Sequence, residues 1–131
     1  MTSWCSVAVA SCLAAQAGAT AATPAAGDAV SLTILFDNNP HTPRLKTGWG
    51  FSAWLEYHGQ AILFDAGPSA DPLLANMAAL GFDPADVDII VVSHAHADHA
   101  GGLAGVLARN AGVAVYLPAG VPASLKAEVS Q

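Results

Sequence analysis

The sequence predicts an α/β fold, and three observations predict it. Short runs of β-branched and apolar residues alternate with stretches in which apolar residues recur at helical spacing, as in layered α/β proteins. The length of 131 residues is enough for one domain at most. A composition that is 53% hydrophobic and only 11% charged excludes a disordered chain.

The first predicted elements are a strand and a β-hairpin. Residues 30–36 are β-branched or apolar and run into a turn-forming Asp-Asn-Asn-Pro cluster, so we expect a strand followed by a polar loop. Residues 51–57 and 61–64 are two apolar runs separated by His58-Gly59-Gln60. This spacing is typical of a hairpin with glycine in its turn.

Alternating helices and strands are expected after the hairpin. Asp71-Pro72 predicts a helix with Asp71 as its N-cap, and Gly81 predicts its end. Residues 88–92, Asp-Ile-Ile-Val-Val, predict a strand whose continuous apolar run is of the kind that is buried on both faces of a sheet. A short helix, a strand and a last helix are expected at 103–109, 113–117 and 122–129.

The first 27 residues differ from the rest because they contain no charged residue and no histidine. An apolar stretch that runs into Ala15-Gln16-Ala17 predicts a cleaved export signal, followed by an Ala-rich linker and a domain over 28–131. An exported or periplasmic protein is therefore expected. The lack of Lys or Arg before the apolar stretch leaves open an Ala-rich tail or a misassigned start, and Cys12 leaves open lipoprotein anchoring. Both cysteines, Cys5 and Cys12, lie in this segment, so the mature chain would have no thiol.

Charge and hydropathy exclude several partners. The chain carries 4 Lys and Arg against 10 Asp and Glu, a formal net charge of −6. So few basic residues argue against binding to nucleic acid or to an anionic membrane surface. No segment offers the roughly 20 uninterrupted apolar residues of a membrane span. The expected partner is a small-molecule substrate.

The segment with the clearest chemistry is His94-Ala95-His96-Ala97-Asp98-His99, directly after the predicted buried strand. Residues two apart in an extended loop project to one side, so His94 and His96 can face one cation, while a turn at Asp98-His99 directs two more ligands nearby. Imidazole and carboxylate ligands suit Zn²⁺, Fe²⁺ or Mn²⁺ rather than Ca²⁺ or Mg²⁺. Gly101-Gly102 would permit a sharp exit into the next helix. The alternatives are a solvated His-rich turn and a metal-binding tract without catalysis.

Other polar and aromatic residues are weaker candidates. Asn39 and His41 lie in the first loop, which can line the site, although a solvated loop is the favoured interpretation. His58 is expected to be exposed in the hairpin turn. Trp49, Phe51 and Trp54 are expected to pack in the core or against loops rather than to form a substrate platform.

These motifs resemble a known family. The pattern His94-x-His96-x-Asp98-His99-x-Gly101-Gly102 resembles the signature of the metallo-β-lactamase-fold hydrolases, and Leu63-Phe64-Asp65-Ala66-Gly67 resembles the Asp-x-Gly that ends an earlier strand of that fold. The resemblance covers about residues 30–117. Ser93, Phe36-Asp37-Asn38 and Trp49-Gly50-Phe51-Ser52 are similar, more narrowly, to the dihydropterin ribofuranosyl-aminobenzene-phosphate synthase-like branch.

The resemblance implies a fold, a cofactor and roles for five residues. The fold would be an αββα sandwich, of which this chain carries mainly the N-terminal half. Two divalent transition metals are implied, zinc first and manganese or iron otherwise, the first held by His94 and His96 and the second by Asp98 and His99. Asp65 would be a carboxylate behind the ligands that orients their loop. Hydrolysis would use a metal-bound water whose pKa falls toward about 7, with Asp98 holding the hydroxide and relaying a proton.

The chain departs from the resembled family downstream of the motif. Further ligands are implied there, namely a third histidine, a bridging carboxylate and a last histidine, but no His or Asp follows His99. We therefore expect either an N-terminal fragment of a longer metal-dependent hydrolase or a non-catalytic metal-binding half-domain that a partner chain completes. In both cases an apolar sheet face would be exposed, available for self-association or for a partner.

Overall fold

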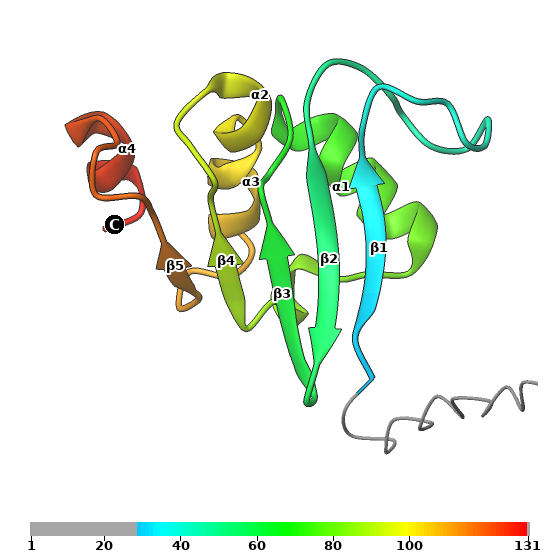
Figure 1. The fold of residues 1–131 in the computed structure, drawn as a ribbon, viewed down its shortest axis with the longest axis horizontal. Coiled ribbons are helices and arrows are strands. Elements are labelled where there is room, and N and C mark those ends of the chain that lie inside the picture. The colour runs from blue at the N-terminus through cyan, green and yellow to red at the C-terminus, as the bar shows by residue number, and fades with distance from the viewer. Residues whose placement is uncertain (1–28, 131) are drawn as a thin grey trace, which may run out of the picture.

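The computed structural model describes residues 29–130 and shows a five-stranded mixed sheet beside short helices (Figure 1). The predicted leader, residues 1–27, lies outside the described residues. The strand order is β1-β2-β3-β4-β5, antiparallel from β1 to β3 and parallel from β3 to β5. The strands are β1 (Ser31–Phe36), β2 (Ser52–Tyr57), β3 (Gln60–Phe64), β4 (Ile89–Val91) and β5 (Ala114–Tyr116). The predicted α/β class is confirmed.

The hairpin of β2 and β3 forms through a two-residue turn. His58 and Gly59 have φ angles of 50° and 77°, and Tyr57 pairs with Gln60 across the turn. Two central residues with positive φ give the turn whose twist matches that of the flanking strands, and glycine supplies the second without strain. The hairpin prediction is confirmed, and His58 is exposed as expected.

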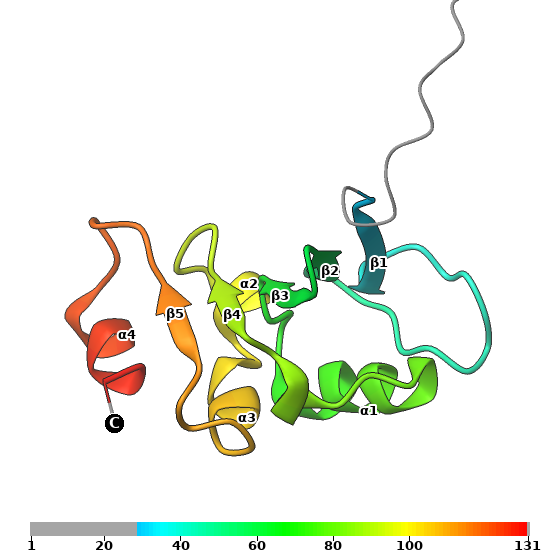
Figure 2. The same cartoon turned by 90° about the horizontal axis from the view of Figure 1, so that it is seen from below.

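The helices are short, and two of them cover one face of the sheet. In Figure 2, α1 and α3 lie on the same side of the strands, whereas α2 lies beyond one end of the sheet in Figure 1. The helical segments are α1 (Ala70–Leu80), the 3-10 turn η1 (Pro84–Asp86), α2 (Ala97–Ala100), α3 (Leu103–Leu107) and α4 (Ala123–Glu128). No helix within residues 29–130 has both the length and the apolar character that a membrane crossing needs.

The start of α1 differs from the prediction, and its end agrees. Ser69, with extended backbone, is the N-cap rather than Asp71, which lies in the first turn. Pro72 misled the prediction because proline is tolerated throughout a first turn, where backbone N–H groups lack helical partners in any case. Asp71 still interacts favourably with the helix dipole. Gly81 ends the helix in the left-handed conformation, with φ of 85°.

The hydrophobic core fills the space between the sheet and its helices. Trp54, which is 3% exposed, stacks on Phe82 with a centroid distance of 4.6 Å. Its prediction as a core residue is confirmed. The core side chains from the strands and helices include Leu35, Trp54, Leu63, Leu73, Met77, Ile90, Leu103 and Val106.

The opposite face of the sheet is apolar, and no helix within residues 29–130 covers it (Figure 2). Because side chains alternate along each strand, two rows of paired residues share this face. The rows are Ile34, Ala53, Phe64, Val91 and Tyr116, and Leu32, Leu55, Ile62, Ile89 and Ala114. For β4, burial on both faces was predicted wrongly. Ile90 is fully buried, but Ile89 and Val91, which point to the open face, are half-buried.

Candidate metal centre

The His-rich motif lies at the carboxyl end of β4, next to the carboxyl end of β3. Because β3 and β4 are parallel neighbours, the loops that follow them meet at one end of the sheet. The chain stays extended at His96 and then turns once through α2, which presents Asp98 and His99. The expected turn at Asp98-His99 is therefore a single helical turn.

Three of the predicted ligands converge. His94, His96 and Asp98 each offer one ligand atom, and these atoms all lie within 4.8 Å of one another. The rings of His94 and His96 are 4.7 Å apart between centroids and nearly perpendicular. Two imidazoles and a carboxylate are a donor set of the kind that catalytic zinc sites use, with a fourth position left for water. The side chains present therefore fit a divalent transition metal.

His99 lies beside this trio rather than within it. Its Nε2 is 3.6 Å from Oδ2 of Asp98, and its ring centroid is 4.2 Å from that of His94. His99 and Asp98 are thus neighbours, as a second metal position would require. The division of the four ligands between two metals remains a prediction.

Asp65 is the buried carboxylate behind the motif. The residue is 1% exposed, and its φ of 56° is unusual for a residue other than glycine. Its Oδ1 accepts a hydrogen bond from the backbone N–H of Ser93 at 2.7 Å, and its Oδ2 accepts one from the Ser93 hydroxyl, also at 2.7 Å. Oδ2 is also 2.7 Å from Nδ1 of His99. A strand-end carboxylate therefore contacts Ser93, directly before the motif, and His99, at its end.

Backbone hydrogen bonds fasten the same region. The Asp65 N–H donates to the carbonyl of Val91, and the Ala66 N–H donates to the carbonyl of His99 at 2.6 Å. The hydroxyl of Ser52, which is fully buried, donates to the Asp65 carbonyl at 2.7 Å. These bonds hold Asp65 in its left-handed conformation and place its carboxylate under the motif.

The two glycines after the motif provide space rather than an unusual backbone conformation. Gly101 and Gly102 have φ angles of −65° and −88°, which any residue can adopt, so the expectation that the exit from the motif uses the backbone freedom of glycine is wrong. A methyl group at Gly101 would overlap the Pro68 carbonyl, and one at Gly102 would overlap the Ala66 carbonyl. The glycines therefore let α2 and α3 approach the β3–α1 loop closely.

The loop between β1 and β2 reaches the same end of the sheet. The Phe51 N–H donates to the Asp98 carbonyl, and a methyl group at Gly50, where φ is 144°, would overlap that carbonyl. Phe51 is half-buried, with its ring 6.4 Å from that of Phe64. Trp49, by contrast, is 76% exposed, so its predicted packing in the core or against a loop is wrong.

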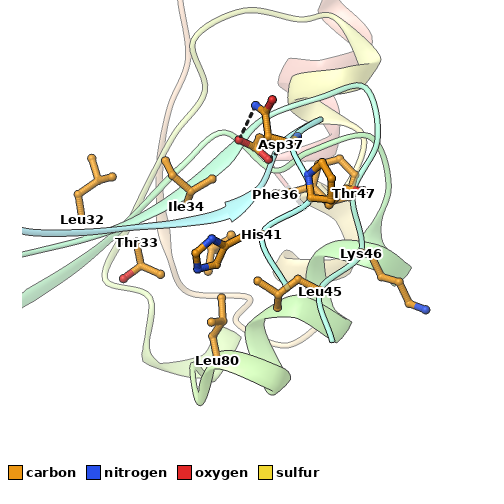
Figure 3. Close-up of a pocket in the computed structure, with 13 residues that line it drawn as sticks. Leu32, Thr33, Ile34, Phe36, Asp37, His41, Leu45, Lys46, Thr47 and Leu80 are labelled. Carbon is orange, nitrogen blue, oxygen red and sulfur yellow. Dashed lines mark hydrogen bonds between the residues drawn. The ribbon is translucent and has the colours of Figure 1, made fainter. Parts of the chain in front are cut away.

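A groove of about 510 Å³ lies away from the motif, along the outer edge of β1 (Figure 3). Leu45, Leu80 and His41 form its wall opposite the strand, and Asn39 also lines it. None of the motif residues lines it. Asn39 and His41 therefore belong to this groove and not to the metal-ligand cluster.

Two residues important for this geometry were not recognised from the sequence. Ser93 was noted only as part of a branch motif, although its hydroxyl joins Asp65 and lies 2.8 Å from Nδ1 of His94. Asn76 is 1% exposed and was not noted at all. A signal was present for Asn76, because it lies three residues after Leu73 and one before Met77, on the buried stripe of α1.

Comparison with known proteins gives one family. The family model described as "Metallo-beta-lactamase superfamily" matches residues 48–131, which include the Asp65 strand end and the whole His-rich motif.

Similar proteins align over part of their length. A 7,8-dihydropterin-6-methyl-4-(beta-D-ribofuranosyl)-aminobenzene-5'-phosphate synthase from Methanocaldococcus jannaschii is 42% identical over 62 residues, which are 46% of this chain and 21% of that protein. The exodeoxyribonuclease WalJ of Streptococcus pneumoniae is 39% identical over 67 residues, which are 51% of this chain and 24% of that protein. The chain therefore spans about a quarter of the length of these relatives.

A solved structure supports the fold. The short form of human tRNase Z superposes with a TM-score of 0.56 over 76% of this chain and 36% of that one, at 20% sequence identity. At this identity the likeness concerns the fold alone.

Proposed function

The chain belongs to the metallo-beta-lactamase superfamily, and from that membership we propose that the protein of which these residues are part is a metal-dependent hydrolase. One observation carries the proposal. His94, His96 and Asp98 place their ligand atoms within 4.8 Å of one another at the carboxyl end of β4, the end of an α/β sheet where catalytic sites form.

Two different pairs of side chains would hold the two metals. His94 and His96 would bind the first, Asp98 and His99 the second, with zinc the favoured metal and manganese or iron the alternatives. When bound, such ions supply an activated water near neutral pH and polarise the bond that is cleaved.

The chain's own side chains add positioning and proton transfer. Asp98 is half-buried and projects from the short helix α2, whose backbone is fastened to Phe51. Its carboxylate would hold the attacking water and accept a proton from it. Asp65 would accept hydrogen bonds from His99 and from the backbone N–H of Ser93 and so hold the ligand loop in place.

For the substrate, we propose a small molecule. The four Lys and Arg side chains of the sequence all lie outside the motif, at 44, 46, 109 and 126. An anionic substrate would therefore depend on the metals for charge neutralisation. The nuclease among the relatives acts on nucleic acid by its name, but this chain has a net charge of −6 and no Lys or Arg between positions 46 and 109. Export of the protein remains part of the proposal and rests on residues 1–27.

Metal binding and hydrolysis test the proposal together. The 131-residue chain should bind Zn²⁺ in equilibrium dialysis, and His96→Ala and Asp98→Ala should each weaken binding by about 10-fold or more. His41→Ala, which removes an exposed imidazole in the groove along β1, is the matched control and should change nothing. A chain extended past residue 131 should hydrolyse at least one chromogenic ester, phosphodiester or β-lactam and lose that activity with a chelator.

Three results would contradict the proposal. The first is a chain that binds no Zn²⁺, and the second is undiminished hydrolysis in His96→Ala and Asp98→Ala. The third is metal binding without hydrolysis in the extended chain together with a stable complex with a second polypeptide. This third result would favour a metal-binding half-domain, for which the apolar sheet face is the supporting observation.

A further inference from the structure

The hydrogen bonds around Asp65 determine which nitrogen of two ligand histidines carries the proton. A neutral imidazole has one N–H donor and one nitrogen with a free lone pair, and a metal can bind only the latter. The sequence does not say which nitrogen is which. Ser93 and His99 contact the buried carboxylate directly, and His94 contacts the hydroxyl of Ser93, so the protons available in these contacts answer the question.

Asp65 is a carboxylate, so it accepts hydrogen bonds and donates none. Oδ2 of Asp65 lies 2.7 Å from Nδ1 of His99, so Nδ1 must be the donor in this contact. The proton of a neutral His99 is then on Nδ1, and its Nε2 keeps the lone pair. That Nε2 is the nitrogen that faces Asp98, at 3.6 Å from Oδ2.

Ser93 links Asp65 to His94. The Ser93 hydroxyl has one hydrogen, which it donates to Oδ2 of Asp65 at 2.7 Å. Its oxygen also lies 2.8 Å from Nδ1 of His94, and since its hydrogen is already used, it must accept there. Nδ1 of His94 is therefore protonated, and Nε2 keeps the lone pair.

We infer that Ser93 is a positioning residue. Because its hydroxyl donates to Asp65, its oxygen accepts a hydrogen bond from Nδ1 of His94, and Nε2 of this imidazole stays free for a metal. One buried carboxylate thereby sets two ligand histidines, His99 directly and His94 through a hydroxyl. His96 is the built-in contrast, because its imidazole has no hydrogen-bonded partner within residues 29–130. The inference rests on the proposed metal site, but its first test needs no metal.

The tautomers can be read directly in the metal-free chain. Long-range proton–nitrogen NMR of the ¹⁵N-labelled 131-residue chain at about pH 8, above the ordinary pKa of a free imidazole, distinguishes protonated from free ring nitrogens. In the unaltered chain, His94 and His99 should show Nδ1–H alone and His96 a mixture of both tautomers. A wild-type His94 with its proton on Nε2 would overturn the inference.

Three substitutions separate the two branches of the network. Ser93→Ala should return His94 to a mixture and leave His99 unchanged. Ser93→Thr keeps the hydroxyl and should keep the wild-type pattern. Asp65→Asn should disturb both histidines, because an amide group can donate as well as accept. His96 should not respond to any of the three. A fixed His94 tautomer in Ser93→Ala would contradict the relay, whatever the stability of that variant.

Zn²⁺ binding supplies the second readout. Ser93→Ala should weaken the site that uses His94 by about 10- to 100-fold, the usual effect of removing a partner behind a ligand, while Ser93→Thr stays within about 3-fold of wild type. The two hypotheses fail separately. Fixed tautomers in a chain that binds no Zn²⁺ would refute the proposed function alone. The relay alone would be refuted if wild type and Ser93→Ala bound Zn²⁺ equally tightly and His94 of the wild-type chain showed both tautomers.

Discussion

Asp65 and Asn76 are both polar residues with 1% exposure, and each holds a loop at the same end of the sheet. The Asn76 side chain donates to the carbonyls of Leu35 and Lys46 and accepts from the N–H of Lys46. Every one of these partners is a backbone group. The Asp65 carboxylate accepts from one backbone N–H and from two side chains, those of Ser93 and His99.

The difference teaches how to separate a structural from a functional buried polar residue. Bonds that end on the backbone determine the path of a loop, here the segment between β1 and β2. Bonds that end on ligand side chains determine in addition which atoms those ligands present. Burial and hydrogen-bond number are alike for the two residues, so only the identity of the partners distinguishes them. Substitutions at the two positions should therefore have different consequences for metal binding.

The largest effect is expected for Asp65→Ala. The Ser93 N–H, the Ser93 hydroxyl and Nδ1 of His99 would all lose their acceptor, which should lower the free energy of unfolding by about 2–4 kcal/mol. Zn²⁺ binding should fall below detection because two ligand imidazoles are no longer held. Chemical denaturation and calorimetric Zn²⁺ titration would measure the two quantities. Retained wild-type affinity in a folded Asp65→Ala chain would mean that Asp65 is structural, like Asn76.

Asn76→Ala should have a smaller effect and only on stability. The carbonyls of Leu35 and Lys46 would lose a donor, and we expect about 1–3 kcal/mol lower unfolding free energy. The Zn²⁺ affinity, measured where the variant is fully folded, should remain within about 3-fold of wild type, because none of the Asn76 bonds reaches a ligand. A loss of affinity as large as that of Asp65→Ala would show that the β1–β2 loop takes part in the metal site, through Phe51 and Asp98.

The same contrast explains what could be predicted from the sequence. The strands, the hairpin turn and the contiguous His94–His99 motif depend on local patterns, so periodicity and residue type were sufficient to find them. The partners of Asn76 and Asp65 are 28 to 41 positions away, so no local pattern identifies them. Asp65 was recognised only because it belongs to a family motif.

Errors in the prediction have the same origin. Trp49 was expected to pack because tryptophan usually does, yet its exposure depends on the path of a loop that Asn76 anchors and Gly50 brings against Asp98. Gly101 and Gly102 were assigned to a sharp turn because glycine permits one. Their real constraint is the distant β3–α1 loop, whose carbonyls leave no room for a side chain.

The smallest expected effect belongs to Ser52→Ala, and it tests the rule within Asp65 itself. The Ser52 hydroxyl donates to the backbone carbonyl of Asp65 at 2.7 Å and not to its carboxylate. If the identity of the hydrogen-bond partner decides the outcome, loss of the Ser52 hydroxyl should lower the unfolding free energy by about 0.5–1.5 kcal/mol and leave the Zn²⁺ affinity within about 2-fold of wild type. The same denaturation and titration experiments apply. The matched variant is Ser93→Ala, which removes a serine hydroxyl that does donate to the carboxylate. A Ser52→Ala chain that loses affinity as Ser93→Ala does would show that the left-handed backbone of Asp65, rather than its carboxylate contacts, controls the ligands.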